Sequence, residues 1–208
     1  MPRSAIRTAC ALLGLAAILA ACGGPQATAT PAVSPPSAGP SLSPGAQLDA
    51  ALAPFADGYD FVSEVTLQDV AATHGEGRRV GEDSETVVGT GEGQVIVRTV
   101  GTQAWTKKPG EDWVAVDEPA DAIDQIAALR EPTIVRATAP IDGMPAFVAT
   151  YPPGALGLNG ADIGSVIFQV HPDGTVEVTY EVPLQNGSAV SHTLFSPLTD
   201  PTPIVAPS

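Results

Sequence analysis

The chain contains 208 residues, with 23 acidic and nine basic side chains, and its formal net charge at pH 7 is −14. So acidic a surface disfavours nucleic acid and is repelled by anionic lipid head groups. The charge therefore argues against nucleic acid as a partner and against membrane attachment by charge alone.

Residues 1–21 have the pattern of a bacterial lipoprotein signal peptide. Arg3 and Arg7 form a basic start, and the apolar run over residues 9–19 is too short to span a bilayer. The sequence LAACG (residues 19–23) resembles the lipobox, where signal peptidase II cleaves before the cysteine and the thiol carries a diacylglycerol. The alternative is an ordinary secretory signal with an incidental cysteine. We expect a lipid anchor at Cys22 that holds the protein on the extracytoplasmic face of the cell membrane.

Cysteine usage agrees with this expectation. Cys10 would leave with the signal peptide, so the mature chain keeps Cys22 alone and forms no internal disulfide. Once Cys22 is acylated, no thiol remains for nucleophilic catalysis, redox chemistry or metal binding. Loss of Arg3 and Arg7 leaves seven basic residues against 23 acidic ones. The covalent anchor, rather than charge, would therefore account for membrane attachment.

Residues 22–45, which begin with the lipidated cysteine, are predicted to form a stalk. Between Pro25 and Pro44 the chain is rich in Pro, Ala, Ser and Thr and has no charged residue, which predicts an extended, disordered spacer. Residues 46–208 then form one domain, which is long enough to bury a core without disulfides.

Two short helices are expected in this domain. Ser43 and Pro44 provide an N-cap and a first-position proline for a helix over Gln47–Phe55. A second helix opens at Glu118-Pro119 and ends at about Arg130, shortly before another proline. Its apolar residues recur every three positions and predict one buried stripe, which comprises Ile123, Ile126 and Leu129.

Almost all other segments alternate between apolar and polar residues, as strands do. Asp142-Gly143 and Asp173-Gly174 are typical of tight hairpin turns. Strands joined by hairpins predict an antiparallel sheet and an α+β, mostly β, fold class. The expected strands are Phe61–Leu67, Val95–Val100, Ile134–Ala139, Ala146–Tyr151, Val166–Val170, Val176–Val182 and Val190–Phe195.

Both tryptophans lie in one further predicted hairpin, centred on Pro109-Gly110. A three-residue loop would set Trp105 opposite Trp113, whereas a four-residue turn would set Trp105 opposite Val114. Either register offers a cross-strand pair between Lys107 and an acidic residue. The sequence favours a hairpin over an exposed aromatic platform and leaves both registers open.

The order of these elements resembles a known family. The lipobox and stalk precede a short helix, the strand sequence YDFV (residues 59–62) and the tryptophan hairpin (residues 101–113). The Pro119 helix, the hairpin sequence IDGMP (residues 141–145), the Asp173-Gly174 hairpin and a closing segment from Phe195 to Pro207 follow. The whole resembles the LolA-like superfamily, and within it the LppX/LprG-type envelope lipoproteins.

This resemblance implies a curved, incompletely closed antiparallel sheet, or half-barrel, with short helices over its concave face. In relatives the concave side forms an apolar cavity that holds acyl chains while a lipid or lipoglycan crosses the envelope. We expect this protein to bind or carry such a ligand. The implied cavity lining, with the helix stripe as a lid, is Phe61, Val65, Leu67, Val97, Ile123, Ile126, Leu129, Phe168 and Val170.

The same residues would also serve in a filled β-core. The alternative function is therefore a non-catalytic envelope sensor or structural module that binds a protein partner. An internal cavity open to amphiphiles would distinguish a carrier from such a module.

Residue types that carry catalysis or bind metals lack the necessary spacing. His74, expected in a glycine-rich loop, His171, expected at a turn, and His192 match no metal-ligand pattern. The sequence GTGEGQ (residues 89–94) lacks the Gly-Lys-Ser/Thr ending of a phosphate loop. Residues 57–60 and 82–83 supply too few oxygens for a calcium loop. We expect a monomeric protein with no catalytic residue, no cofactor and no metal site.

Overall fold

A computed structural model describes residues 41–208, apart from residues 69, 91–92, 117–123, 158–163 and 185. Residues Pro40–Ser208 form one compact unit. The predicted signal peptide, the anchor at Cys22 and most of the predicted stalk lie outside the described residues.

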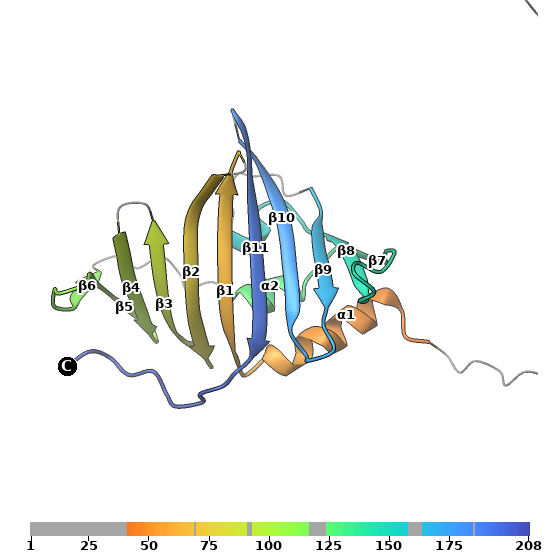
Figure 1. The fold of residues 1–208 in the computed structure, drawn as a ribbon. Coiled ribbons are helices and arrows are strands. Elements are labelled where there is room, and N and C mark those ends of the chain that lie inside the picture. Colours follow the sequence, from red (N-terminus) through yellow and green to blue (C-terminus); the bar gives the residue numbers. More distant parts are fainter. Residues whose placement is uncertain (1–40, 69, 91–92, 117–123, 158–163, 185) are drawn as a thin grey trace, which may run out of the picture. The chain divides into compact units, whose positions relative to one another are not determined.

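In the described part of the chain, eleven strands form one antiparallel sheet in the order β6-β5-β4-β3-β2-β1-β11-β10-β9-β8-β7. β1 and β11 pair in the middle, and hairpins extend the sheet to both sides (Figure 1). The end strands β6 and β7 do not pair with each other, so the sheet is not closed. The strands are β1 (Gly58–Leu67), β2 (Val70–Val80), β3 (Asp83–Thr90), β4 (Gly93–Val100), β5 (Gln103–Lys107), β6 (Val114–Val116), β7 (Ile134–Ala137), β8 (Ala146–Thr150), β9 (Val166–Val170), β10 (Val176–Leu184) and β11 (Gly187–Pro197).

Alternation along the strands gives the sheet two different faces. In β10, Val176 and Val178 are almost fully buried, whereas Glu177 between them is only half-buried. The register carries this alternation across the sheet, because Val176 lies opposite Phe195 of β11, and Phe195 lies opposite Phe61 of β1. We call the face that carries Val178, Phe195 and Phe61 the inner face, and the opposite one the outer face.

Helix α1 (Pro44–Leu52) begins where the sequence predicts a cap. The Ser43 hydroxyl accepts a hydrogen bond from the N–H of Ala46 at 3.3 Å, and Pro44 occupies the first helical position. The helix therefore begins before the predicted Gln47 and continues into the 3₁₀ turn η1 (Ala53–Phe55).

Helix α2 (Gln125–Leu129) is the described part of the second predicted helix. Asp124 is its N-cap, and the carboxylate accepts a hydrogen bond from the N–H of Ala127 at 3.1 Å. The predicted N-terminal portion, including Ile123, lies within the undescribed residues 117–123. A second 3₁₀ turn, η2 (Ala155–Gly157), precedes β9.

The hydrophobic core joins both helices to the inner face of the sheet. Leu48 and Leu52 of α1, and Ile126 and Leu129 of α2, are each at most 2% exposed. Because burial of apolar surface is the main driving force of folding, this contact fixes two short helices that would be marginal alone. The remaining members of the core are Phe55, Tyr59, Phe147, Ala149, Val166, Phe168, Val176, Val178 and Phe195.

The two predicted Asp-Gly turns are confirmed. Asp142 and Gly143 have φ values of 50° and 79°, the left-handed pair that a type I′ turn requires. At the other turn, the Gly174 N–H donates to the His171 carbonyl at 3.1 Å. A backbone hydrogen bond from Thr175 stabilises the Asp173 carboxylate and lowers the pKa of that group.

The predicted strands and the mostly-β class are confirmed, with bounds that differ by a few residues at most. However, β2 and β3 have no counterpart among the predicted strands. His74, expected in a loop, lies within β2. Gly75, Gly77 and neighbouring charged residues give β2 a low strand propensity. The strand forms because it pairs along most of its length with β1 on one side and β3 on the other.

Candidate functional site

The structure buries part of the predicted cavity lining in the core. Ile126, Leu129 and Phe168 belong to the buried cluster, and each is at most 2% exposed. Phe61 and Val170 pack against the margin of that cluster. The three strand residues therefore lie on the helix-covered part of the inner face, and Ile126 and Leu129 of α2 pack in the same core.

The other predicted residues lie away from the core. The register places Val65 of β1 and Val97 of β4 on the inner face, where both are half-buried. Leu67, at the end of β1, is 42% exposed. Ile123 is outside the described residues.

The cavity that the described residues form beneath α2 is small. A cavity of about 30 Å³ lies between α2 and the inner face of β10 and β11. One water molecule takes a similar share of liquid volume, roughly 30 Å³. An acyl chain does not fit there without movement of the helix. The cavity is lined by Gln125, Leu129, Leu156, Val178, Tyr180, Thr193 and Phe195.

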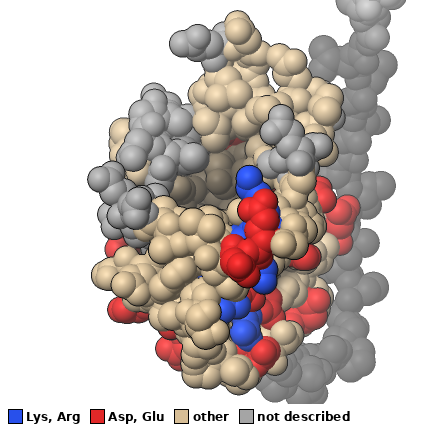
Figure 2. Space-filling view, turned by 90° about the vertical axis from the view of Figure 1, so that its left-hand side faces the viewer, with Lys and Arg blue, Asp and Glu red and all other residues tan. Residues whose placement is uncertain are grey.

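The inner face continues beyond the helices onto β2, β3 and β4. The main contacts of the α-helices and 3₁₀ turns are with β7, with β11 and with one another. Figure 2, viewed from the side of β6, shows a hollow in the surface near a band of mixed basic and acidic side chains. We use the name open trough for the half-buried inner-face residues Val65, Thr73, Gly77, Thr86, Val88, Val95 and Val97.

The buried Tyr59 and the half-buried Tyr151 tie α2 to the sheet. The Tyr151 hydroxyl donates a hydrogen bond to the Leu129 carbonyl at 2.7 Å, and burial raises the pKa of Tyr151 above its ordinary value. Burial also raises the pKa of Tyr59 to about 12, and the nearby Asp124 carboxylate acts in the same direction. Both phenols therefore keep their protons at neutral pH and act as hydrogen-bond donors rather than as bases.

The tryptophan hairpin forms, but in neither predicted register. Thr106 pairs with Val114, so Trp105 lies opposite Ala115. The predicted turn is present, since the Glu111 N–H donates to the Lys108 carbonyl at 3.0 Å. The strands begin to pair farther from this turn than expected because Trp113 packs beside Arg98 rather than joining the ladder.

Arg98 of β4 lies at the centre of a cluster on the outer face that also contains Glu85, Lys107 and Trp113. Its Nε donates to Glu85 at 2.6 Å, its Nη1 donates to the Val205 carbonyl at 3.0 Å, and its guanidinium lies 4.7 Å from the centroid of the Trp113 ring. The Lys107 ammonium is 5.8 Å from the centroid of the same ring. The sequence instead predicts a cross-strand pair between Lys107 and an acidic residue. Cation–π contacts therefore account for the position of the Trp113 ring. Both tryptophans lie away from the open trough.

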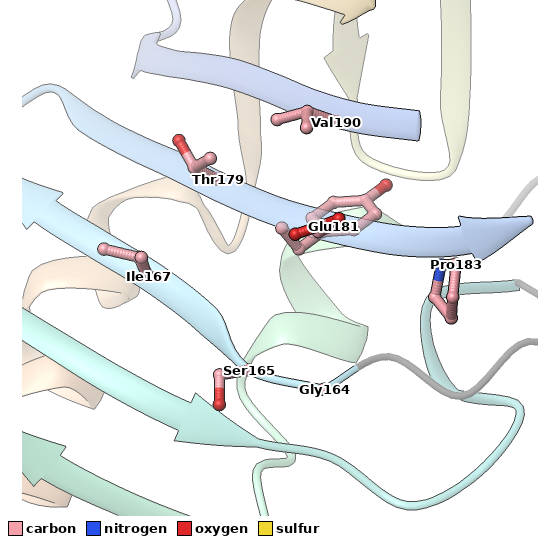
Figure 3. Close-up of a pocket in the computed structure, with 8 residues that line it drawn as sticks. Gly164, Ser165, Ile167, Thr179, Glu181, Pro183 and Val190 are labelled. Atoms are coloured by element: carbon pink, nitrogen blue, oxygen red, sulfur yellow. The ribbon is translucent and has the colours of Figure 1, made fainter. Parts of the chain in front are cut away.

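A depression of about 480 Å³ on the outer face has no counterpart in the sequence prediction. Ile167, Thr179 and Val190 come from the adjacent strands β9, β10 and β11, and the Glu181 side chain lies at the same site (Figure 3). These residues are far apart in the sequence, and only the strand order brings them together. Gly164, Ser165, Tyr180 and Pro183 complete the lining.

Each histidine lies beside a glutamate. His192 Nε2 is 2.8 Å from one carboxylate oxygen of Glu177, and His171 Nε2 is 3.5 Å from the other. His74 Nδ1 is 3.7 Å from Glu64. Strand pairing, rather than sequence spacing, produces these contacts. Among the described residues, no group of three or more His, Cys, Asp or Glu side chains is arranged to hold a metal ion.

No helix in the described part of the chain has the length and apolar character needed to cross a bilayer. Comparison with protein-family models finds no match to the chain. Comparison with curated proteins finds none either.

Proposed function

We propose that this protein is a lipoprotein, anchored through Cys22 at the extracytoplasmic face of the cell membrane, that binds or carries an acyl lipid or lipoglycan. In this proposal the inner face is the concave side of a half-barrel. The helices cover β1 and β7 to β11, with the start of α2 beside Arg79 of β2, and the ligand lies in the open trough.

One observation carries this proposal. The residues of the open trough are apolar, small or hydroxyl-bearing and only half-buried, and the main helix contacts lie elsewhere. An acyl chain laid along Val88, Val95 and Val97 would gain about 0.8 kcal/mol for each methylene that it buries. A covalent anchor would keep this surface close to a membrane that supplies such chains.

A second function is favoured by the filled space beneath α2. The cavity there is only about 30 Å³, which is the size of a packing defect in an ordinary core. A sensor or structural module that binds a protein partner would need no more than this core. The two functions differ in whether lipid occupies the open trough.

The anchor is tested by metabolic labelling with radioactive palmitate in a bacterial host. We expect label to remain with the wild-type chain after denaturing electrophoresis and to be absent from the Cys22→Ala variant. Equal labelling of both chains would place the acyl group elsewhere, and absence of label from both would contradict the anchor.

Ligand binding is tested on the chain from residue 22 onward with Cys22→Ala, which contains the whole compact unit and carries no covalent lipid. The purified protein is extracted with organic solvent, and the extract and the intact protein are analysed by mass spectrometry. We expect near-stoichiometric acyl lipid.

Two adjacent residues of β4 provide matched variants. Val97 lies on the inner face and Ile96 on the outer face. We expect Val97→Glu to lose the lipid and Ile96→Glu to retain it. A lipid-free wild-type protein would contradict the carrier function and favour the protein-binding module. Equal loss in both variants would place the lipid outside the open trough.

A further inference from the structure

The inner face of the sheet carries a single charge among its described strand residues. The hydrogen-bond register places Arg79 of β2 on this face, opposite Tyr59 of β1 and Ser84 of β3. All other inner positions of the described strands are apolar, glycine, proline, tyrosine or hydroxyl-bearing. The preceding residue, Arg78, points to the outer face and pairs with Asp200 at 2.6 Å.

Arg79 is buried without full compensation. It is 9% exposed, and its Nε is buried with no hydrogen-bond partner among the residues that the structure describes. The Asp124 carboxylate lies 3.5 Å from that nitrogen and makes no hydrogen bond to it. The other oxygen of Asp124 already caps α2 at Ala127. Because a buried guanidinium is costly unless its donors are matched, this arrangement leaves a cationic donor directed at the inner face.

A second donor lies beside Arg79. Tyr59 is its cross-strand partner, is 3% exposed, and keeps its phenolic proton at neutral pH for the reason given above. A guanidinium and a neutral hydroxyl on adjacent strands match the oxygens of a carboxylate or phosphate.

The open trough leads away from this pair of donors. Gly77 lies two residues before Arg79 on the same face of β2, about 6.6 Å away along the strand. It has no side chain that would block the trough at this point. Thr86 and Val97 continue the row across β3 and β4. An acyl chain lying on these residues would place its polar end near Arg79.

We propose that Arg79, with Tyr59 beside it, binds the anionic head of the ligand, so that the protein selects acyl chains that carry a carboxylate or a phosphate over neutral ones. The inference rests on the proposed function and adds the chemical class of the ligand. It also gives the buried charge of Arg79 a role that its loose contact with Asp124 does not supply.

The test compares probes that share a chain and differ in the head. Palmitate is compared with cetyl alcohol for a carboxylate, and oleoyl lysophosphatidic acid with monoolein for a phosphate. Affinities are measured by displacement of an uncharged fluorescent acyl probe from the delipidated Cys22→Ala chain. Tryptophan emission is not used, because both tryptophans lie away from the trough. We expect the anionic member of at least one pair to bind about tenfold more tightly, and the pair that shows this preference identifies the head group.

Three variants connect this preference to Arg79. Arg79→Met should abolish it by weakening the binding of the anionic member far more than that of the neutral member. Arg78→Met, the neighbouring arginine on the outer face, should leave it intact. Asp124→Asn retains a capping side chain and removes the competing carboxylate, so it should strengthen the preference. Circular dichroism confirms that each variant is folded, and Asp124→Asn tests the proposal even if Arg79→Met does not fold.

The outcomes separate this inference from the function on which it rests. If neutral and anionic chains bind the wild-type protein equally, the head-group inference is overturned and lipid carriage stands. The same conclusion follows if Arg79→Met keeps the preference, or if Asp124→Asn leaves it unchanged. If no chain of either kind binds, both the carrier function and this inference are overturned.

Discussion

At the scale of single residues, Gly77 shows how closely the central strands approach one another. A Cβ at this position would collide with the Glu85 carbonyl oxygen and would lie 2.9 Å from Thr86 Cα and 3.1 Å from the Phe61 ring. The two backbone contacts belong to β3 and are rigid. Glycine is therefore required at position 77 by packing, although it has a low strand propensity.

We expect Gly77→Ala to lower the free energy of unfolding by about 1–3 kcal/mol, as overpacking of a close contact does. Gly75 offers a matched control on the same strand and face, since a Cβ there would come no closer than 3.9 Å to any neighbour. Gly75→Ala should change stability by less than about 0.5 kcal/mol. Urea unfolding of both variants measures the difference, and equal losses would contradict the packing explanation.

At the scale of elements, α2 is too short to be stable by itself. It spans Gln125–Leu129 and is fixed by buried side chains, by the Asp124 cap and by the hydrogen bond from Tyr151 to Leu129. Arg130, at its C-terminal end, also pairs with Asp49 of α1 at 2.8 Å. These contacts hold both ends of the described helix, which is why the proposed ligand site is the open trough rather than the space beneath α2.

Ile126 and Gln125 provide a direct test of this packing. Ile126 is 1% exposed, whereas Gln125 is exposed. We expect Ile126→Ala to cost about 3 kcal/mol by leaving a cavity in a filled core, and Gln125→Ala to cost less than about 0.5 kcal/mol. The measurement is chemical denaturation. A small loss at Ile126 would indicate that α2 is a loosely held lid.

At the scale of the whole molecule, stability depends on groups that are buried in their neutral form. The pKa of Tyr59 rises from 10.0 to about 12 on folding, chiefly by burial. Between these values the unfolded chain releases the proton and the folded chain retains it. This contribution to stability is therefore fully present below pH 10 and is lost as the pH rises towards 12.

We expect the free energy of unfolding to fall by roughly 3 kcal/mol over this interval on account of Tyr59, at about 1.4 kcal/mol for each pKa unit. Tyr151 should add a loss of the same sign, because burial also raises its pKa. Denaturant unfolding at a series of alkaline pH values, compared between the wild-type chain and Tyr59→Phe, measures the effect. An unchanged slope in the variant would assign the alkaline loss to other groups.

Much of the local structure could be predicted because it depends on near neighbours in the sequence. Ser43-Pro44 specifies the start of α1, and Asp142-Gly143 adopts the left-handed angles that only a few residue types accept readily. The alternation of Val176 and Val178 with Glu177 predicts both the strand and its buried face. In each case the side chain and the backbone that it controls are a few residues apart.

Other features depend on residues that are far apart in the sequence. β2 forms only because β1 and β3 satisfy its backbone, and the register of the tryptophan hairpin shifts because Arg98 of β4 attracts the Trp113 ring. The sequence could identify Arg79 as a charged residue, but not as the single charge on the inner face of the described strands. Its proposed role depends on which residues of β2 face the inner side of the sheet, and local propensity does not predict that strand.

The sequence by itself determined the periodicity, the caps, the turns and hence a mostly-β antiparallel fold, since these arise from short-range sterics and from the spacing of apolar residues. The tertiary structure decided which face of the sheet is covered, how far the core is filled, and which polar groups meet across the strands. Those properties depend on the pairing of β1 with β11 and on the packing of both helices, and each of these contacts closes a long loop of chain that no local pattern specifies.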